Sequence, residues 1–116
     1  MPKCGGFMTT LTLDKQHVDI LEQFGDIQEL LQTLVHRYVL EQTQQKIEAL
    51  QNDINLYEKK YGLSYQKFER NVATDEAFIQ RVEAIDFLWE RDSNIWLYTI
   101  EELKAWQTRL ANISNA

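Results

Sequence analysis

The chain has 116 residues and a mass of 13.8 kDa, which fits one domain, and its 44% of apolar residues predicts a packed core rather than a disordered chain. A single cysteine excludes an internal disulfide framework, and no apolar run is long enough to span a membrane, so we predict a cytoplasmic protein. The net charge of −6 argues against a general nucleic-acid binder, because such proteins contact phosphates through a basic surface.

The first predicted element is a β-strand in the stretch "GFMTTLTLDKQ", residues 6–16, after a flexible N-terminus at residues 1–6. Its side chains alternate between two faces, with Thr9, Leu11 and Leu13 on one and Met8, Thr10 and Thr12 on the other. This period of two is typical of a half-buried strand. Because buried backbone groups need hydrogen-bond partners and the rest of the chain predicts helices, the strand needs a partner from another chain.

Two helices follow, separated by a glycine. Asp14 is placed as the N-cap of a short helix, "KQHVDILEQF", which Gly25 ends. Asp26 then caps a helix that no breaker interrupts, so we predict one long helix from about 27 to 61. It begins with a broad apolar face and continues as a narrow seam with coiled-coil spacing. The seam residues are Leu40, Thr43, Ile47, Leu50, Ile54, Tyr57 and Tyr61.

The C-terminal part predicts a turn and a further long helix, which together with the preceding helix make a helical hairpin. Gly62 ends the long helix, Ser64 caps a short one, and Leu63 and Phe68 have the spacing of a hydrophobic staple. We predict another helix from Asp75 to about 111, with a weak point at "RDSN", residues 91–94. Its seam consists of Phe78, Val82, Ile85, Trp89, Asp92, Trp96, Thr99, Leu103, Trp106 and Leu110.

No residues have the pattern of a catalytic or metal site. His17 and His36 lie on different predicted helices, far in sequence from Cys4, and the chain has neither a metal-ligand spacing nor a glycine-rich phosphate loop. Most carboxylates fall on polar helix faces, where burial does not tune the pKa of a general acid or base. The sequence therefore predicts a non-enzymatic protein with no cofactor and no metal.

The last helix carries a second apolar row beside its seam, more than one neighbouring helix can cover. From this row we predict four residues that bind a protein partner: Phe87, Leu88, Leu97 and Ile100. Residues 75–116 have eight acids and four bases, and their net charge of −4 suits a basic partner, although a solvated helix face has the same composition.

The order strand, short helix, glycine and longer helix over residues 7–42 resembles the ribbon-helix-helix fold, in which two chains pair their strands antiparallel. The resemblance implies an obligate homodimer and a shared core that contains Leu11, Leu13, Leu30 and Leu34. It also implies DNA contacts by the outward residues Met8, Thr10 and Thr12, and a phosphate held by the backbone at residues 26–28.

Two features of this sequence depart from that DNA-binding pattern. Threonine and methionine form weaker contacts with base edges than the Arg, Lys, Asn or Gln often found there. The carboxylate of Asp26 also competes with a phosphate for the same helix N-terminus. We therefore predict dimerisation first, with weak binding to operator DNA as the alternative.

Residues 60–69, "KYGLSYQKFE", are similar to a motif that ends a long helix in a group of small prokaryotic antitoxin-like proteins. The matching residues are Lys60, Tyr61, Gly62, Leu63, Ser64, Tyr65, Phe68 and Glu69. The resemblance implies a dimerisation segment at 7–42 followed by a helical part at 43–116 that binds a cognate toxin. We thus predict a mainly α antitoxin-like protein; a ribbon-helix-helix repressor and a purely structural helical dimer are the alternatives.

Overall fold

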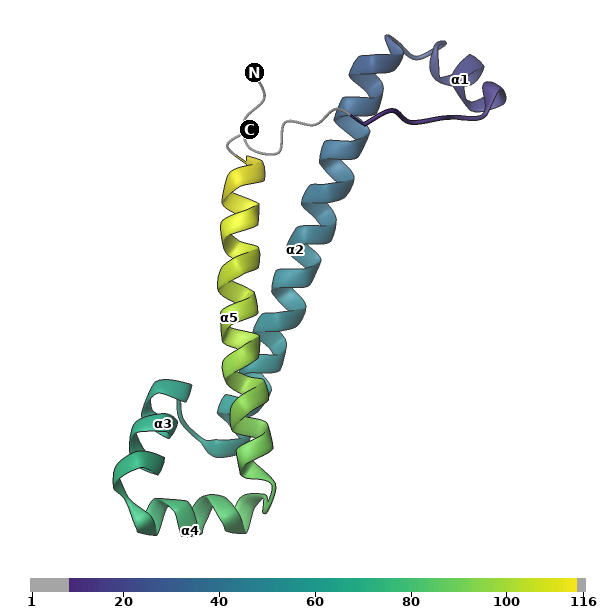
Figure 1. Cartoon of the computed structure of the whole chain (residues 1–116). Helices are drawn as coiled ribbons and strands as arrows, with labels where there is room; N and C mark the ends of the chain where they lie inside the picture. The colour runs from purple at the N-terminus through teal and green to yellow at the C-terminus, as the bar shows by residue number, and fades with distance from the viewer. Residues whose placement is uncertain (1–8, 115–116) are drawn as a thin grey trace. The chain divides into compact units, whose positions relative to one another are not determined.

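The computed structural model describes residues 9–114 and confirms a mainly α fold (Figure 1). The described residues form five helices: α1 (Lys15–Leu21), α2 (Ile27–Tyr61), α3 (Tyr65–Thr74), α4 (Glu76–Ile85) and α5 (Trp89–Ser114). The chain divides within α2 into two compact units, Met1–Tyr38 and Val39–Ala116, called here the N-terminal and C-terminal units. None of the five helices is both long and apolar enough to cross a bilayer.

The predicted β-strand is absent from the part of the chain that the structure describes. Residues 9–13 have no regular structure, while Met8 and the predicted flexible segment 1–6 lie outside the described residues. A strand is defined by its backbone pairing with another strand, and residues 9–114 of one chain offer no such partner. The ribbon between two chains therefore stays a prediction.

Helix α1 starts where the sequence predicts and ends three residues early. Asp14 has the extended backbone of an N-cap, but its side chain accepts no cap hydrogen bond. The amides of Gln23 and Phe24 donate to carbonyls three residues back, at 3.0 and 2.9 Å, so the chain tightens into a turn after Leu21. Gly25 follows with a φ of +150°, a region that favours glycine.

The single helix predicted for residues 27–61 is confirmed. Its N-terminus is capped as expected, because the amide of Glu29 donates to Asp26 Oδ2 at 3.1 Å. All seven predicted seam residues are buried or half-buried in the C-terminal unit. Thr43 is the polar member of the seam, and its hydroxyl donates to the Val39 carbonyl at 2.7 Å, so its burial leaves no unpaired hydroxyl.

The turn after α2 also follows its local signals. Gly62 has a φ of +81°, and its amide donates to the Glu58 carbonyl at 2.7 Å, which closes the last turn of the helix. Ser64 caps α3 by accepting a hydrogen bond from the Lys67 amide. Leu63 packs against the core that contains Phe68, in agreement with the predicted staple.

An aromatic core holds the C-terminal unit together, where α5 runs antiparallel to the second half of α2 (Figure 1). Trp96 of α5 is 0% exposed and stacks on two α2 rings, with centroid distances of 5.7 Å to Tyr57 and 5.9 Å to Tyr61. The ring centroid of Phe68 in α3 lies 5.2 Å from that of Trp96 and 5.9 Å from that of Phe78 in α4. Ring pairs at these separations stabilise a core beyond the area that they bury.

The prediction of one helix from 75 to 111 is wrong, because the chain breaks at residues 86–88 and continues as a helix through 91–94. Asp86 has an extended backbone, and its Oδ1 accepts the Leu88 amide at 2.8 Å, which ends α4 and starts the turn. Within the supposed weak point, Asp92 pairs with residues of α2. These tertiary contacts override weak helix propensity.

Candidate functional site

The candidate binding features of the described residues are surfaces and hollows. Among residues 9–114, no group of three or more His, Cys, Asp or Glu side chains is arranged to hold a metal ion. His17 on α1 and His36 on α2 are both exposed. The features with chemical content are an apolar surface in the N-terminal unit, and an ionic cluster, two hollows and an apolar turn in the C-terminal unit.

The N-terminal unit leaves most of its large apolar side chains in contact with solvent. None of residues 9–38 is buried, and Phe24 and Tyr38 are 75% and 63% exposed. We call the following set the N-terminal apolar residues: Leu11, Leu13, Ile20, Phe24, Leu34, Val35 and Tyr38. Of the four leucines predicted for a dimer core, Leu11, Leu13 and Leu34 are exposed and Leu30 is half-buried.

The residues predicted to read DNA lie in an acidic setting. Thr10 and Thr12 are exposed, and Thr10 lines a hollow of about 400 Å³ against the first turns of α2 together with Leu11 and Val35. Residues 9–38 hold five acids and two bases, a net charge of −3. Asp26 already occupies the start of α2, where the resemblance would place a phosphate. These observations disfavour phosphate contact by this unit.

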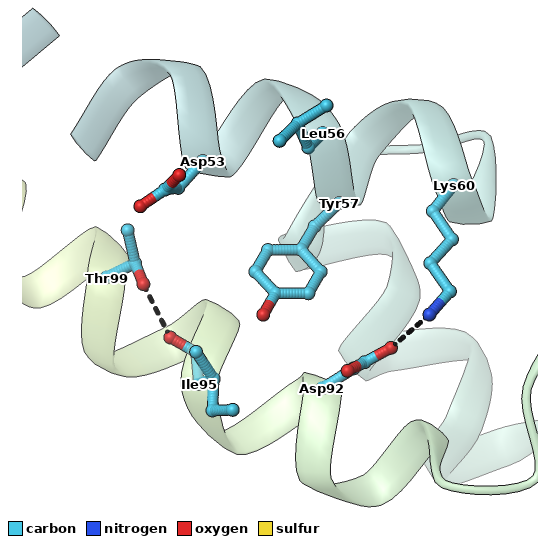
Figure 2. Close-up of a pocket in the computed structure, with 7 residues that line it drawn as sticks. All are labelled: Asp53, Leu56, Tyr57, Lys60, Asp92, Ile95 and Thr99. Carbon is cyan, nitrogen blue, oxygen red and sulfur yellow. Dashed lines mark hydrogen bonds and ion pairs between the residues drawn. The ribbon is translucent and has the colours of Figure 1, made fainter. Parts of the chain in front are cut away.

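An ionic cluster joins the end of α2 to both sides of the α4–α5 turn. Lys60 Nζ donates to Asp86 Oδ2 at 2.6 Å and to Asp92 Oδ2 at 2.7 Å, the second of which is drawn in Figure 2. The Tyr61 hydroxyl donates to the same Asp92 oxygen at 2.6 Å. The Asp92 side chain is 8% exposed, so its charge is buried and needs these partners.

The cluster shifts the pKa values of its members in the directions that its hydrogen bonds dictate. Bonds to Asp86 and then Asp92 raise the pKa of Lys60, because both carboxylates favour the ammonium form. Burial, and then the hydrogen bond to Asp92, raise the pKa of Tyr61. The bonds from Lys60 and from the Leu88 amide lower the pKa of Asp86. These shifts favour a charged Lys60, a charged Asp86 and a neutral Tyr61 across the physiological range.

A hollow of about 410 Å³ lies beside this cluster between α2 and α5 (Figure 2). Polar groups of Asp53, Tyr57 and Asp92 face it, and Leu56 and Ile95 form an exposed apolar rim. The Thr99 hydroxyl is satisfied internally, since it donates to the Ile95 carbonyl at 2.7 Å.

The four predicted partner-binding residues do not share one face. Leu97 and Ile100 line a second hollow, of about 480 Å³, together with Tyr65 of α3, and Ile100 also packs on the aromatic core. Phe87 and Leu88 belong instead to the α4–α5 turn, residues 86–88. Leu97 lies within α5, whereas Leu88 directly precedes the first residue of that helix, so the two pairs belong to different elements. The two pairs therefore lie at different places on the surface of the C-terminal unit.

The ionic cluster is the feature that sequence reasoning missed. Lys60 lies 26 residues before Asp86 and 32 before Asp92, so no local spacing indicates the pairing. One signal was present: Asp92 occupies a position in the apolar seam of the last helix. A carboxylate in a seam that must be buried needs a cationic or hydrogen-bonding partner on the facing helix.

Comparison with protein-family models, with curated proteins and with solved structures finds no match for this chain.

Proposed function

We propose that this protein is a non-enzymatic binding protein that pairs with a second copy through its N-terminal unit and binds another protein through its C-terminal unit. The observation that carries the proposal is the contrast in burial between the units. Large apolar side chains such as Leu11, Phe24 and Tyr38 stay exposed in the N-terminal unit, although burying them would be favourable. Exposed apolar side chains that are grouped in one region are typical of a protein–protein interface.

A second copy of this chain is the partner that best fits the surface formed by the N-terminal apolar residues. The segment at 9–13 has no partner strand within residues 9–114, and the same segment of another chain would provide one in antiparallel pairing. Pairing two such segments would place Leu11 and Leu13 of both chains against the apolar face of α2, which includes Leu34. This is the arrangement that the ribbon-helix-helix resemblance implies.

We further propose an antitoxin as the biological role. The proposal rests on the similarity of residues 60–69 to the antitoxin-like motif and on the acidic C-terminal unit, which suits a basic toxin. A toxin and its antitoxin are usually encoded by neighbouring genes, so the candidate partner is the product of the adjacent gene. The acidic N-terminal unit supplies no observation that favours a DNA-binding repressor.

Sedimentation of the full chain tests the pairing. We expect a dimer at micromolar concentration, and Leu11→Asp should convert it to a monomer because it would bury a carboxylate in the shared core. Leu56→Asp is the matched control: Leu56 is as exposed as Leu11 but lies in the C-terminal unit, so the dimer should persist. A monodisperse wild-type monomer would refute the proposed pairing.

Co-expression with the adjacent gene product tests the role. If the protein is an antitoxin, that product should inhibit growth alone, become tolerated in the presence of this chain, and copurify with it. Tolerance without copurification, or copurification without growth inhibition by the product alone, would contradict the antitoxin role. Electrophoretic mobility shifts on the upstream DNA at low salt would reveal any repressor activity, because phosphate contacts are strongest there.

A further inference from the structure

The α4–α5 turn exposes an aromatic side chain in a unit that buries its other phenylalanines. Phe68 and Phe78 are 1% and 7% exposed, whereas Phe87 is 83% exposed. Its neighbours Ile85 and Leu88 are also exposed, so three large apolar residues lie within four positions of the chain. Aromatic side chains at such projecting positions are the residues that most often dominate the energy of protein interfaces.

Hydrogen bonds hold this turn in one conformation. Both carboxylate oxygens of Asp86 are used, Oδ1 by the Leu88 amide at 2.8 Å and Oδ2 by Lys60 Nζ at 2.6 Å. The Asp86 amide donates to the Val82 carbonyl, and its carbonyl accepts the Trp89 amide. Surface turns are usually mobile, and ordering them on binding reduces affinity. Here the turn is ordered by contacts within the C-terminal unit.

The charges around the turn are predominantly negative. Glu83, Asp86, Glu90 and Asp92 lie on or beside it, against Lys60 and Arg91, which leaves a net charge of −2. Lys60 is already paired with two of these carboxylates, while Glu83 and Glu90 are exposed. A partner with arginine or lysine at the edge of its binding pocket would be complementary to this surface.

We propose that the α4–α5 turn is the contact through which the C-terminal unit binds its protein partner, by insertion of Phe87 and Leu88 into an apolar pocket with a basic rim. Lys60 is a positioning residue, because it holds Asp86 and thereby the turn without touching the partner's pocket. This inference rests on the proposed function and specifies which surface the partner takes and what chemistry it has. It leaves Leu97 and Ile100 outside the contact, since they line a separate hollow together with residues of α2 and α3.

Titration calorimetry of the full chain with the adjacent gene product tests the contact. We expect Phe87→Ala to weaken binding about 30-fold or more, as for the dominant residues of an interface, and Leu88→Ala to weaken it less. Leu56→Ala is the matched control, since Leu56 is 66% exposed in the same unit, and it should change affinity less than about threefold. The wild-type affinity should fall as salt is raised, because the rim contacts are between exposed charges.

The role of Lys60 is tested by a double-mutant cycle. Lys60→Gln should weaken binding about fivefold in the wild-type background and have little effect in the Phe87→Ala background, because it acts through the turn. Lys60→Arg should restore most of the affinity, since arginine can also bridge two carboxylates. Equal effects of Lys60→Gln in both backgrounds would show a merely structural role and overturn the positioning assignment.

Other results separate this inference from the proposed function. If the wild-type chain binds and Phe87→Ala binds within about threefold of it, the turn is not the contact, although the antitoxin role survives. If the wild-type chain does not bind at all, both fail. If Phe87→Ala instead lowers the chain's own sedimenting mass, the turn contacts a second copy, and the assignment to a different protein is overturned. If the affinity did not depend on salt, the inference that the partner's pocket has a basic rim would be overturned.

Discussion

The two units of this chain are similarly apolar but bury their side chains very differently. Twelve of the thirty residues from 9 to 38 are apolar, close to the 44% of the whole chain. In the described part of the chain, every buried residue nevertheless belongs to the C-terminal unit. Composition alone therefore does not decide whether a segment forms a core.

The difference lies in how many elements surround each apolar face. In the C-terminal unit, rings from α2, α3, α4 and α5 converge on Trp96 and Phe68. In the N-terminal unit, α1 has seven residues, and no residue of it is buried. A helix of two turns covers too little area to bury a neighbour's apolar face. The C-terminal unit therefore buries its own apolar side chains, whereas the N-terminal unit would do so only with the second chain that we propose.

The largest effect on the free energy of unfolding is expected from a substitution at the centre of the aromatic core, and it would sharpen the comparison of the two units. Trp96→Ala should destabilise the C-terminal unit by about 4 kcal/mol, because it removes a fully buried ring and leaves a cavity. The exposed Tyr38 in the N-terminal unit is the control, and Tyr38→Ala should change the unfolding free energy of the C-terminal unit by less than about 0.5 kcal/mol. Urea denaturation followed by circular dichroism measures both; equal effects would remove the distinction between the units.

A smaller loss is expected from the ionic cluster. Asp92→Ala should cost about 2 kcal/mol, since it leaves the buried Tyr61 hydroxyl without its acceptor and Lys60 with one carboxylate instead of two. Asp53→Ala is matched to it, because Asp53 lines the same hollow but is exposed, and it should be neutral within about 0.5 kcal/mol. The same denaturation measurement applies. A neutral Asp92→Ala would mean that the cluster does not stabilise the fold.

Protein concentration should distinguish the two units directly. If a second chain stabilises the N-terminal unit, each tenfold rise in concentration should stabilise it by about 1.4 kcal/mol per dimer once most chains are paired. Amide hydrogen exchange in α1 and at residues 27–38 should then slow, while exchange at α3 and α4 stays constant. Concentration-independent exchange in both units would contradict the proposed pairing.

The smallest effect concerns pH and is confined to the C-terminal unit. The pKa of Tyr61 is raised in the folded state, so its contribution to stability is present below the ordinary value of 10.0 and is lost as the pH rises through the folded-state value. The raised pKa of Lys60 acts in the same direction. The pKa of Asp86 is lowered, so its contribution is present above the ordinary 3.8 and is lost as the pH falls through the folded-state value.

The stability of the C-terminal unit should therefore decline above about pH 10 and below about pH 4. Thermal unfolding across this range, followed by circular dichroism, measures the two declines. Tyr61→Phe should reduce the alkaline decline and leave the acid one in place. An unchanged alkaline decline in that variant would show that Tyr61 does not contribute to it.

Much of the fold was predictable because its signals are local. Asp26 and Ser64 cap helices at the predicted positions, and Gly62 ends α2 with a positive φ. The 3–4 spacing of the α2 seam also identifies its buried residues correctly, since the side chains on one stripe of a helix must face the same neighbour.

The errors occur where distant residues decide the structure. Asp86, at which α4 ends, is bonded to Lys60 on another helix, and neither residue signals the other in sequence. The predicted partner-binding residues differ in burial, because a row of apolar residues does not reveal how many helices will cover it. Ile100 is partly covered by the core, whereas Phe87 is not. The predicted N-terminal strand would need a second chain to pair with, and residues 9–13 have no regular structure in the single chain.

The segment "KYGLSYQKFE" acquires a structural meaning from these contacts. Within it, Lys60 bridges two carboxylates, and the buried Tyr61 hydroxyl donates a hydrogen bond to one of them. Gly62 supplies the positive φ that ends α2, and Ser64 caps α3. Phe68 is buried in the aromatic core. The bonds from Lys60 to carboxylates 26 and 32 positions later make this segment act together with the start of α5, which the ten letters alone do not specify.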